Sequence, residues 1–516
     1  MLPLMQTWAL SIAVIVIASA TRIWYKLVSR HVPNPYLDEV FHVPQAQRYC
    51  KGDYSWDPKI TTPPGLQKGQ GSQDETQTQK AESKQTALVD AHTALNIALF
   101  PPLFFFSGLY YTDVISTLLV LLSYNMFLKR GRGRWRFWEN FTYIQVGIVA
   151  LSFRQTNVFW VAVFPAGLAV IDTLKKNGAA SAFSKTTCFR EALKESWVRG
   201  RIHDCPVQEA GLQDVVLFSI STPIAVLGRL FTVLRELLPY LVLLGLFAGF
   251  VAWNGGVVLG DKSNHIATIH LPQMLYIWPY IVFFSLPLAA VPFLSPLVRG
   301  FLTSQVQTFY EKNLVGRASI SAPGFVSAIL FLVFGLGAVH FNTIVHPFTL
   351  ADNRHYVFYV FRILRRHPVI KYLAVPIYYL CYWMTIQALG SRCVESISSN
   401  KPRLDKVKPI SDKADFQPCQ ISFFAVWLAT TALSVITAPL IEPRYFIIPW
   451  IIWRLHISSL AASPSTKRLS GNVSYNMRLA LETVWLLAIN AIVGYNFLYR
   501  GFSWTSEPGR VQRFLW

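Results

Sequence analysis

Long apolar runs, separated by short polar stretches, recur along the whole chain of 516 residues. A helix needs about 20 predominantly apolar residues to cross a bilayer, and most runs approach that length. The run at 143–173 is interrupted by the polar sequence FRQTN, which predicts two helices with a turn between them. The pattern predicts an all-α polytopic membrane protein, with residues 1–516 forming one multispanning domain. The runs lie near 7–28, 94–109, 114–128, 143–173, 215–234, 237–253, 272–297, 324–345, 370–390, 421–440, 444–461 and 480–499.

The composition agrees with this prediction. Hydrophobic residues make up 53% of the chain and charged residues 14%, whereas soluble domains carry about 25% charged residues. The net charge of +20 would suggest a nucleic-acid partner in a soluble protein. Here the basic residues gather in loops, as they do on the cytosolic side of membrane proteins. We therefore expect membrane lipid, and no nucleic acid, around this chain.

The loops fall into two classes that alternate along most of the chain. Basic loops, which we expect in the cytosol, lie at Lys129–Arg136, 174–213, Val298–Arg317 and 391–420. The other loops carry mixed charge, histidines, glycines and aromatic residues, and we expect them on the opposite face. They comprise a first loop at 28–93, YYTD, FRQTN, a loop at 254–271, HPFTLADNRHY and EPRYF. Ionisable residues thus cluster in loops and at the ends of the runs.

One segment departs from this alternation. Residues 67–90 are polar and of low complexity, a composition typical of disordered segments. With one crossing between the first loop and YYTD, the basic loop Lys129–Arg136 would face the wrong side. Either 94–128 is a hairpin that does not cross as two full spans, or a helix that ought to follow Leu66 is absent.

The acid pair Asp38-Glu39 stands just beyond the first apolar run. Such a pair can be a metal site, an acid/base centre or solvated loop charge. Prolines on both sides stiffen this loop, so a carboxylate could be held as a base for a hydroxyl proton. His42 adds hydrogen-bonding surface next to the pair. The cysteines form no CxxC or Cys/His ligand cluster, so they predict no metal site.

Further candidate centres lie in three other loops of the same class. Lys262, His265 and His270 follow a glycine-rich stretch that predicts either an anion site or a re-entrant turn. Arg354 with His355, and Arg444 of EPRYF, could clamp a phosphate or lie as interfacial charge. Because several such centres share one face, lipid-phosphate chemistry is the simplest joint interpretation.

The blocks that carry these residues resemble the dolichyl-phosphate-glucose α-1,2-glucosyltransferases of the endoplasmic reticulum, which are glycosyltransferase C-type enzymes. The resemblance runs in order from about residue 34 to residue 450. One departure lies after TTPPGL, where the family has a second membrane helix and this chain has the polar stretch 67–90. The matching blocks are PYLDEVFHVPQAQRYCKGDYSWDPKITTPPGL, NIALFPPLFFFSGLYYTD, FRQTNVFWV, WNGGVVLGDKSNHIATIHLPQMLY, VHPFTLADNRHYVFYVFR and EPRYFIIP.

The resemblance implies a helical bundle with lumenal loops in the endoplasmic reticulum membrane. It implies dolichyl phosphate glucose as donor and the diglucosylated dolichyl-diphosphate-linked oligosaccharide as acceptor. A β-linked donor and an α-linked product imply inversion by one in-line displacement, with no covalent enzyme intermediate. A lipid phosphate leaving group also leads us to expect no cofactor and no obligatory metal.

The resemblance also implies roles for single residues. Asp38 matches the acid of the first lumenal loop and is the expected base, with Glu39 as a helper. The expected ligands of the donor phosphate are Lys262, His265, Arg354, Arg444, His270 and His355. Supporting or acceptor-binding roles are expected for His42, Asp113, Arg154, Gln155 and Asn157. Competing hypotheses are a transporter or flippase without catalysis, and a regulatory subunit of a channel.

Overall fold

The computed structural model describes residues 2–65, 86–130, 136–177, 189–260, 268–291, 293, 303–306, 323–343, 350–389, 419–438, 442–457, 477–505 and 507–516. Within these ranges the regular structure is helical apart from one short hairpin. Four helices are long and apolar enough to cross a membrane, and several shorter apolar helices accompany them. The prediction of an all-α polytopic membrane protein is therefore confirmed.

The elements follow the apolar runs closely. The first half contains α1 (Leu2–His31), α2 (Glu39–Cys50), α4 (Thr86–Ala98), α5 (Pro101–Phe106), α6 (Asp113–Leu128), α7 (Arg136–Leu151), the turns η1 (Gln155–Asn157) and η2 (Phe159–Val163), α8 (Phe164–Asn177), α9 (Phe189–Arg199), α10 (Leu212–Gly228) and α11 (Leu230–Asn254). The second half contains α12 (Gln273–Phe284), α13 (Leu286–Ala289), α16 (Phe325–Phe341), α18 (Tyr356–Leu364), α19 (Ile370–Leu389), α20 (Ile421–Val435), η5 (Pro443–Phe446), α21 (Ile447–Leu455), α22 (Met477–Tyr499), β1 (Phe502–Ser503) and β2 (Val511–Gln512).

The FRQTN turn is where the sequence predicts it. The helix α7 ends at Leu151, the 3-10 turn η1 spans Gln155–Asn157, and α8 continues to Asn177. Two other elements differ from the predicted pattern. The helix α2 forms inside the first loop, where its mixed polarity gave no apolar run. The break between α10 and α11 lies at Arg229 and not near residue 235.

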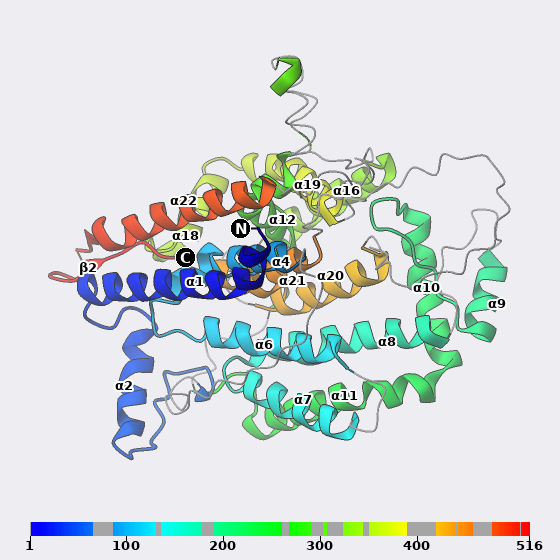
Figure 1. Ribbon diagram of the computed structural model, residues 1–516, viewed down its shortest axis with the longest axis horizontal. Coiled ribbons are helices and arrows are strands. Elements are labelled where there is room, and N and C mark those ends of the chain that lie inside the picture. Colours follow the sequence, from blue (N-terminus) through cyan, green and yellow to red (C-terminus); the bar gives the residue numbers. More distant parts are fainter. Residues whose placement is uncertain are drawn as a thin grey trace.

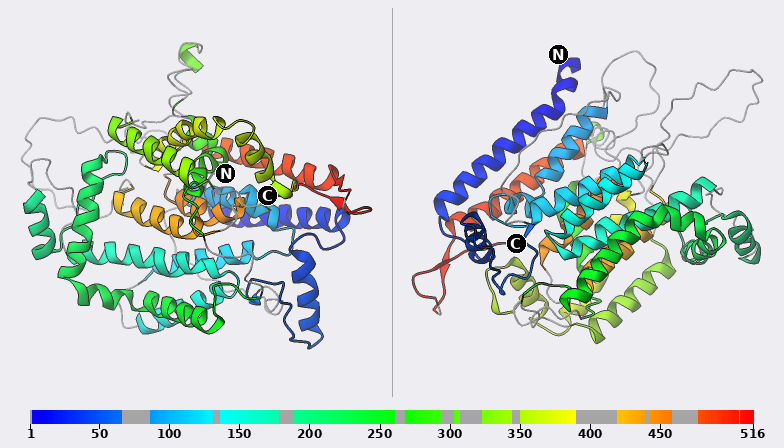
Figure 2. Two further views of the ribbon diagram at one scale, coloured as in Figure 1. Left: turned by 180° about the vertical axis from the view of Figure 1, so that it is seen from behind. Right: turned by 90° about the horizontal axis from the view of Figure 1, so that it is seen from below.

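The described parts of the two classes of loop lie at opposite ends of the bundle. In Figure 1, α2 and the hairpin with β2 lie at one end, and α9 lies at the other; α10 stands across that second end. Figure 2 shows the same arrangement from behind. At the second end, Val207 of the basic loop donates its backbone N–H to Cys419 O at 2.9 Å. We call the end with α2 the site end and the end with α9 the basic end.

The helices α1 and α4 run parallel to each other. Ala9 and Ala13 of α1 pack against Ala91 of α4, while Trp24 donates its indole N–H to Phe105 O of α5 at 2.9 Å. The helix α4 therefore begins beside the first half of α1, and the chain runs from there through α5 toward the site end. The helix that the sequence lacks after Leu66 would fall in residues 66–85, outside the described part of the chain. The described residues show α4–α5 and α6 meeting at YYTD, so both alternatives of the sequence analysis stay predictions.

One buried ion pair lies inside the bundle, away from the loops. Arg454 of α21 donates two hydrogen bonds of 2.7 Å to Glu482 of α22, and Asn96 of α4 donates a third, of 2.8 Å, to the same carboxylate. The Arg454 and Glu482 side chains are 1% and 0% exposed. Arg454 lies in the last turn of α21, as expected of an ionisable group, whereas Glu482 lies inside α22. Mutual pairing is what makes such charges tolerable inside a membrane bundle.

Candidate active site

The turn before α2 presents Asp38 at the site end of the bundle. Leu37, immediately before it, has a φ of 51°, a left-handed conformation that costs a non-glycine residue about 1–2 kcal/mol. Asp38 donates its backbone N–H to the Tyr111 hydroxyl at 3.3 Å. Its side chain is 42% exposed, so the carboxylate is held by its backbone and still open to a substrate.

Glu39 holds this turn in place. Its two carboxylate oxygens accept backbone N–H groups, from Tyr36 at 3.1 Å and from Tyr110 at 2.5 Å. Burial raises the pKa of Glu39, although both N–H donors oppose that shift. The contacts join the Asp38 turn to YYTD.

Arg444 reaches the Asp38 carboxylate from the far end of the sequence. Its Nη1 lies 2.9 Å from Asp38 Oδ2, and its Nε pairs with the Glu442 carboxylate. The guanidinium carbon is 5.7 Å from the centre of the Tyr111 ring. The Arg444 side chain is 17% exposed, so this cation is partly withdrawn from water and held between two acids.

Asp113 extends the cluster inward. Its Oδ1 pairs with Arg154 Nη1, and its Oδ2 lies 4.0 Å from Arg444 Nη1. Asp113 is buried, and its Oδ2 accepts no hydrogen bond within the described residues. Arg154 lies over the Tyr445 ring at 5.5 Å. We call Asp38, Asp113, Arg154, Glu442 and Arg444 the charged cluster; it holds three carboxylates and two guanidinium groups.

The charged cluster sets the protonation of Asp38. Burial raises the pKa of the Asp38 carboxyl and is the largest single influence on it, but the charge and hydrogen bond of Arg444 and the nearby histidines together outweigh it. His42 and His355 lower the Asp38 pKa further when they are protonated. The pKa of Asp38 therefore lies below its ordinary value, and the group is an ionised acceptor of protons at neutral pH.

Residues of the first loop pack against the FRQTN turn. Gln155 donates its side-chain amide to Thr61 O at 2.9 Å, and Gly65 donates its N–H to Ser152 O at 2.9 Å. Asn157 is buried and accepts the Ser116 hydroxyl at 3.0 Å. Gln155 and Asn157, expected as supporting or acceptor-binding residues, thus hold loop and helix together.

The loop after α11 meets the same first loop. Gly260 has a φ of 67°, and a Cβ there would meet the carbonyls of Pro58 and Ile60, the latter at 2.7 Å. Leu259 donates its N–H to Thr61 O at 3.1 Å. A glycine is required here by both the backbone angle and the close approach.

Arg354 and His355 lie in a second group at the site end. Arg354 donates to both oxygens of Asp352, from Nε at 2.8 Å and from Nη2 at 2.7 Å. Its Nη1 donates to Gln512 Oε1 at 3.1 Å. His355 Nδ1 lies 3.1 Å from Trp516 O. Arg354 is thus held by its neighbour and by the last residues of the chain.

The remaining expected residues are placed differently. His42 is buried on α2, and burial lowers its pKa, so the ring is neutral at pH 7. His270 packs beside the end of α20: its backbone N–H donates to Ile436 O, just after that helix, at 2.9 Å. Lys262 and His265 lie outside the described residues. The structure therefore brings together Asp38, Glu39, His42, Asp113, Arg154 and Arg444.

Several contacting residues were not expected from the sequence. Tyr111, Glu442 and Tyr445 complete the charged cluster, and their positions inside YYTD and EPRYF were the available signal. Tyr36 lies inside the matched block PYLDEVFH, whereas Gln512 lies outside every matched block, so the sequence offered no signal for it.

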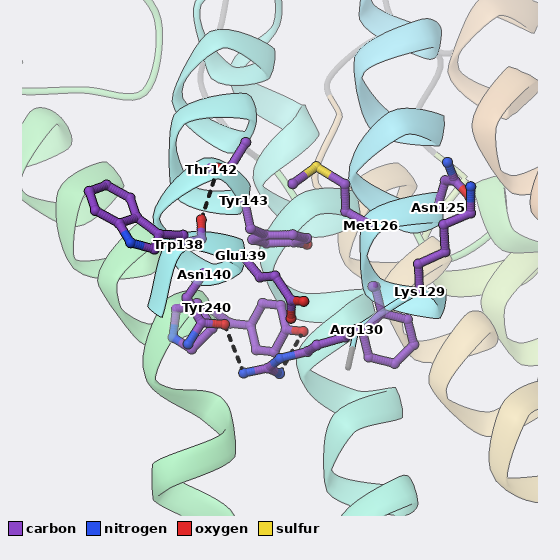
Figure 3. Close-up of a pocket in the computed structure, with 12 residues that line it drawn as sticks. Asn125, Met126, Lys129, Arg130, Trp138, Glu139, Asn140, Thr142, Tyr143 and Tyr240 are labelled. Atoms are coloured by element: carbon purple, nitrogen blue, oxygen red, sulfur yellow. Dashed lines mark hydrogen bonds between the residues drawn. The ribbon is translucent and has the colours of Figure 1, made fainter. Parts of the chain in front are cut away.

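The basic end carries a cavity of about 370 Å³ that is separate from this site. Figure 3 shows Arg130 within it, beside Asn140 and Tyr240. Arg130 donates to Asn140 Oδ1 at 3.1 Å and to the Tyr240 hydroxyl at 3.3 Å. The cavity lies between α6, α7 and α11 at the ends remote from Asp38, so the charged cluster is not part of it.

The basic end also brings together a histidine, a cysteine and an acid. The ligand atoms of His203, Cys205 and Asp214 all lie within 4.8 Å of one another, although the sequence gave no Cys/His cluster. His203 Nε2 is 2.8 Å from Asp214 Oδ1, and Asp214 Oδ2 accepts the Gly211 N–H at 2.8 Å. Burial raises the pKa of the Cys205 thiol to about 12. A helix cap with a protonated thiol beside it accounts for this arrangement.

The fold and the charged cluster define a polytopic helical membrane protein with a carboxylate–arginine centre at one end. The chain belongs to the DIE2/ALG10 family, whose sequence model matches residues 32–68 and 71–455. The interruption at 69–70 falls inside the polar stretch. No solved structure matches the chain.

Curated relatives match nearly the whole chain. The Aspergillus fumigatus protein is 39% identical over 596 residues, with 96% of each chain covered. The Emericella nidulans protein is 40% identical over 594 residues, again with 96% of each chain covered. The Homo sapiens protein is 30% identical over 541 residues, with 95% of each chain covered. All three are named Dol-P-Glc:Glc(2)Man(9)GlcNAc(2)-PP-Dol alpha-1,2-glucosyltransferase. The alignments exceed 516 residues, so they include positions that these relatives have and this chain lacks.

Proposed function

We propose that this chain is an inverting glucosyltransferase of the endoplasmic reticulum membrane, with its site facing the lumen. The donor is dolichyl phosphate glucose, and the acceptor is the dolichyl-diphosphate oligosaccharide that already carries two glucoses. The product carries a third, terminal glucose in α-1,2 linkage. The names of the relatives support this substrate pair, and the Asp38–Arg444 pair at the mouth of the bundle is the observation that carries the proposal.

The reaction makes one bond and breaks one bond. The acceptor hydroxyl oxygen attacks the anomeric carbon of the donor glucose, and the bond from that carbon to the phosphate oxygen breaks. The hydroxyl proton passes to the Asp38 carboxylate, and dolichyl phosphate leaves. Asp38 suits the role of base because it is ionised at neutral pH, half-exposed and held by its backbone.

Arg444 gives Asp38 a way to become more basic during the reaction. The guanidinium lowers the pKa of Asp38 while the two are paired. The leaving phosphate gains negative charge, which an arginine stabilises by charge-assisted hydrogen bonds. As Arg444 turns toward that phosphate, its pairing with Asp38 weakens, and the affinity of Asp38 for the acceptor proton rises.

Other residues support this pair. Lys262, His265, His270, Arg354 and His355 remain the further candidates for the donor phosphate. Glu39 holds the turn of Asp38 through its two backbone contacts. Asp113 and Arg154 keep Arg444 in place from the buried side. We propose that the reaction requires no metal, because the leaving group is already a lipid phosphate.

The test is a lipid-linked oligosaccharide profile of cells that rely on this chain alone. Wild type is expected to make the triglucosylated species, and Asp38→Asn is expected to stop at two glucoses. Asp57→Asn is the matched control, since Asp57 lies in the same loop and caps the Lys59 N–H at 2.9 Å. Equal amounts of folded membrane protein must be compared.

The outcomes separate the hypotheses. A transporter or a regulatory subunit would lose nothing specific in Asp38→Asn, and a normal profile in that variant would contradict the proposed base. If wild type itself stops at two glucoses, residues 67–90 become the first suspect. Inserting a relative's sequence at that position would then decide whether the missing segment is the cause.

A further inference from the structure

The last residues of the chain return to the site end. We call residues 507–516 the tail segment; it contains β2, and in Figure 1 the β1–β2 hairpin lies at the ends of α1 and α22. Leu515 and Gln512 in this segment are 1% and 2% exposed. Gln512 and Leu515 are therefore packed into the protein, whereas residues 508–511 are exposed.

Arg513 joins the ends of two helices. Its Nη1 donates to Phe497 O at 2.8 Å and Leu498 O at 2.7 Å, near the end of α22. Its Nη2 donates to His31 O at 2.9 Å, at the end of α1. The last carbonyls of a helix lack partners inside the helix and carry partial negative charge, so a cation is favourable there. Arg513 thus fixes the point at which the chain leaves α1 toward Asp38.

The backbone of Arg513 forms two hydrogen bonds with the side chain of Tyr36, which lies two residues before Asp38. The Tyr36 hydroxyl accepts the Arg513 N–H at 2.7 Å and donates to Arg513 O at 3.0 Å. Tyr36 in turn donates its own N–H to Glu39 at 3.1 Å. The strained residue Leu37 lies between these two anchors, so the conformation that presents Asp38 depends on both.

The tail segment also holds the second group of candidate residues. Gln512 accepts a hydrogen bond from Arg354 Nη1 at 3.1 Å, and the Leu515 N–H donates to Arg354 O at 3.0 Å. The Tyr356 N–H donates to Leu515 O at 3.2 Å. Arg354 also lies over Trp504, 4.5 Å from its ring. One short segment therefore contacts both the turn of Asp38 and the loop of Arg354.

We propose that the tail segment is a positioning element of the active site, with Arg513 and Gln512 as its positioning residues. It fixes the Asp38 carboxylate relative to Arg354, and hence the acceptor hydroxyl relative to the donor phosphate. The effect of the tail segment on catalysis rests on the proposed function. Its effect on structure, which is to keep the turn at residues 34–38 ordered, is independent of that function.

The first experiment compares Arg513→Ala with Arg510→Ala. Arg510 is the matched control, because it lies in the same hairpin with its side chain 80% exposed and a weak pairing to Glu507 at 3.9 Å. Transfer is measured with detergent-solubilised full-length protein, corrected for folded protein by size exclusion. Misplacing a catalytic group by about 1 Å can cost on the order of 10²-fold in rate. We expect Arg513→Ala to lower kcat by roughly 10- to 100-fold with little change in donor KM, and Arg510→Ala to match wild type.

A pH profile separates positioning from general stability. If Arg513→Ala lets the Asp38 turn drift from Arg444, the acid limb of kcat moves to higher pH, which mere loss of folded protein does not cause. Arg513→Lys is expected to rescue only in part, because one ammonium group cannot serve three carbonyls in the geometry of the guanidinium. Unchanged kcat per folded molecule in Arg513→Ala overturns the catalytic part of the proposal.

Hydrogen–deuterium exchange tests the structural part without any activity. Residues 34–42 are expected to exchange faster in Arg513→Ala than in Arg510→Ala, while α12 and α20 exchange equally in both. Equal exchange at 34–42 overturns the positioning role whatever the protein catalyses. If residues 34–42 exchange faster in Arg513→Ala but the wild-type protein transfers no glucose, the positioning role of the tail segment stands. The proposed glucosyltransferase function is then the part that is contradicted.

Discussion

Arg444 and Asp38 are 406 positions apart in the sequence, yet Arg444 Nη1 lies 2.9 Å from Asp38 Oδ2. The contact joins the residue before α2 to η5, two parts of the chain that are far apart in the sequence. A carboxylate and a guanidinium this close control each other's protonation and position. The predictions below follow from this pair and from the contacts that support it.

Replacing Arg444 by glutamine is expected to weaken catalysis and to change its pH dependence. The leaving phosphate loses a charged donor, so kcat should fall about 10²- to 10³-fold. Burial then acts on Asp38 without the opposing guanidinium, so the pKa of Asp38 rises. Because the base must be unprotonated, the rate falls as pH falls through that pKa, and the acid limb of kcat/KM moves to higher pH.

The control for this change is Arg48→Gln, which removes an exposed arginine from α2, the helix that Asp38 begins. It should leave both the rate and the acid limb unchanged. An acid limb at the wild-type pH in Arg444→Gln would contradict the assignment of that limb to Asp38.

Asp113→Asn is expected to destabilise the protein. Asp113 is buried between Arg154 and Arg444, and removing its charge leaves two partly buried guanidinium groups beside a neutral amide. Breaking such a pair costs about 3–5 kcal/mol. Thermal unfolding of the purified protein in detergent measures the loss. Glu195→Gln, at a pair with Arg199 and Arg201 whose acid is 30% exposed, should cost at most about 1 kcal/mol.

Gly260→Ala is expected to displace the first loop. A Cβ at residue 260 meets the carbonyls of Pro58 and Ile60, and the positive φ adds strain. Gly509→Ala is the matched control: its φ is 82°, but a Cβ there has no atom within 4 Å. Both variants carry backbone strain of about 1–2 kcal/mol, and only Gly260→Ala should lower transfer activity. Equal activity in the two would mean that the loop contact is not needed.

The orientation in the membrane can be tested with natural and engineered glycosylation sequences. Asn140, in the sequence Asn-Phe-Thr, accepts a hydrogen bond from Arg130 at the basic end. It is expected to stay unmodified, because we place that end in the cytosol. Asp53→Asn creates Asn-Tyr-Ser in the exposed first loop and is expected to gain a glycan. A mobility shift that endoglycosidase removes is the measurement, and a glycan at Asn140 in its place would reverse the orientation.

The sequence predicted the helices well because membrane spans are recorded in continuous apolar runs. It also selected Asp38, Asp113, Arg154 and Arg444 from four separate blocks, and the fold brings them into one cluster. It did not predict α2, whose residues alternate between apolar and polar without a long run. Nor did it assign a role to Arg513. The side chain of Arg513 donates to backbone carbonyl oxygens, and every residue has one, so the sequence does not mark its partners. Contacts of that kind leave no trace in side-chain chemistry.

The pair Arg454–Glu482 has a consequence for the order in which the protein is made. Glu482 lies on α22, the last of the described helices, whereas Arg454 precedes it on α21. Until α22 emerges from the ribosome and enters the membrane, Arg454 lacks its carboxylate partner, and an unpaired charge in a bilayer is costly. The bundle can therefore close only late in synthesis. Since Arg513 follows α22 in the sequence, its hydrogen bond to the end of α1 also forms only after α22 has been made.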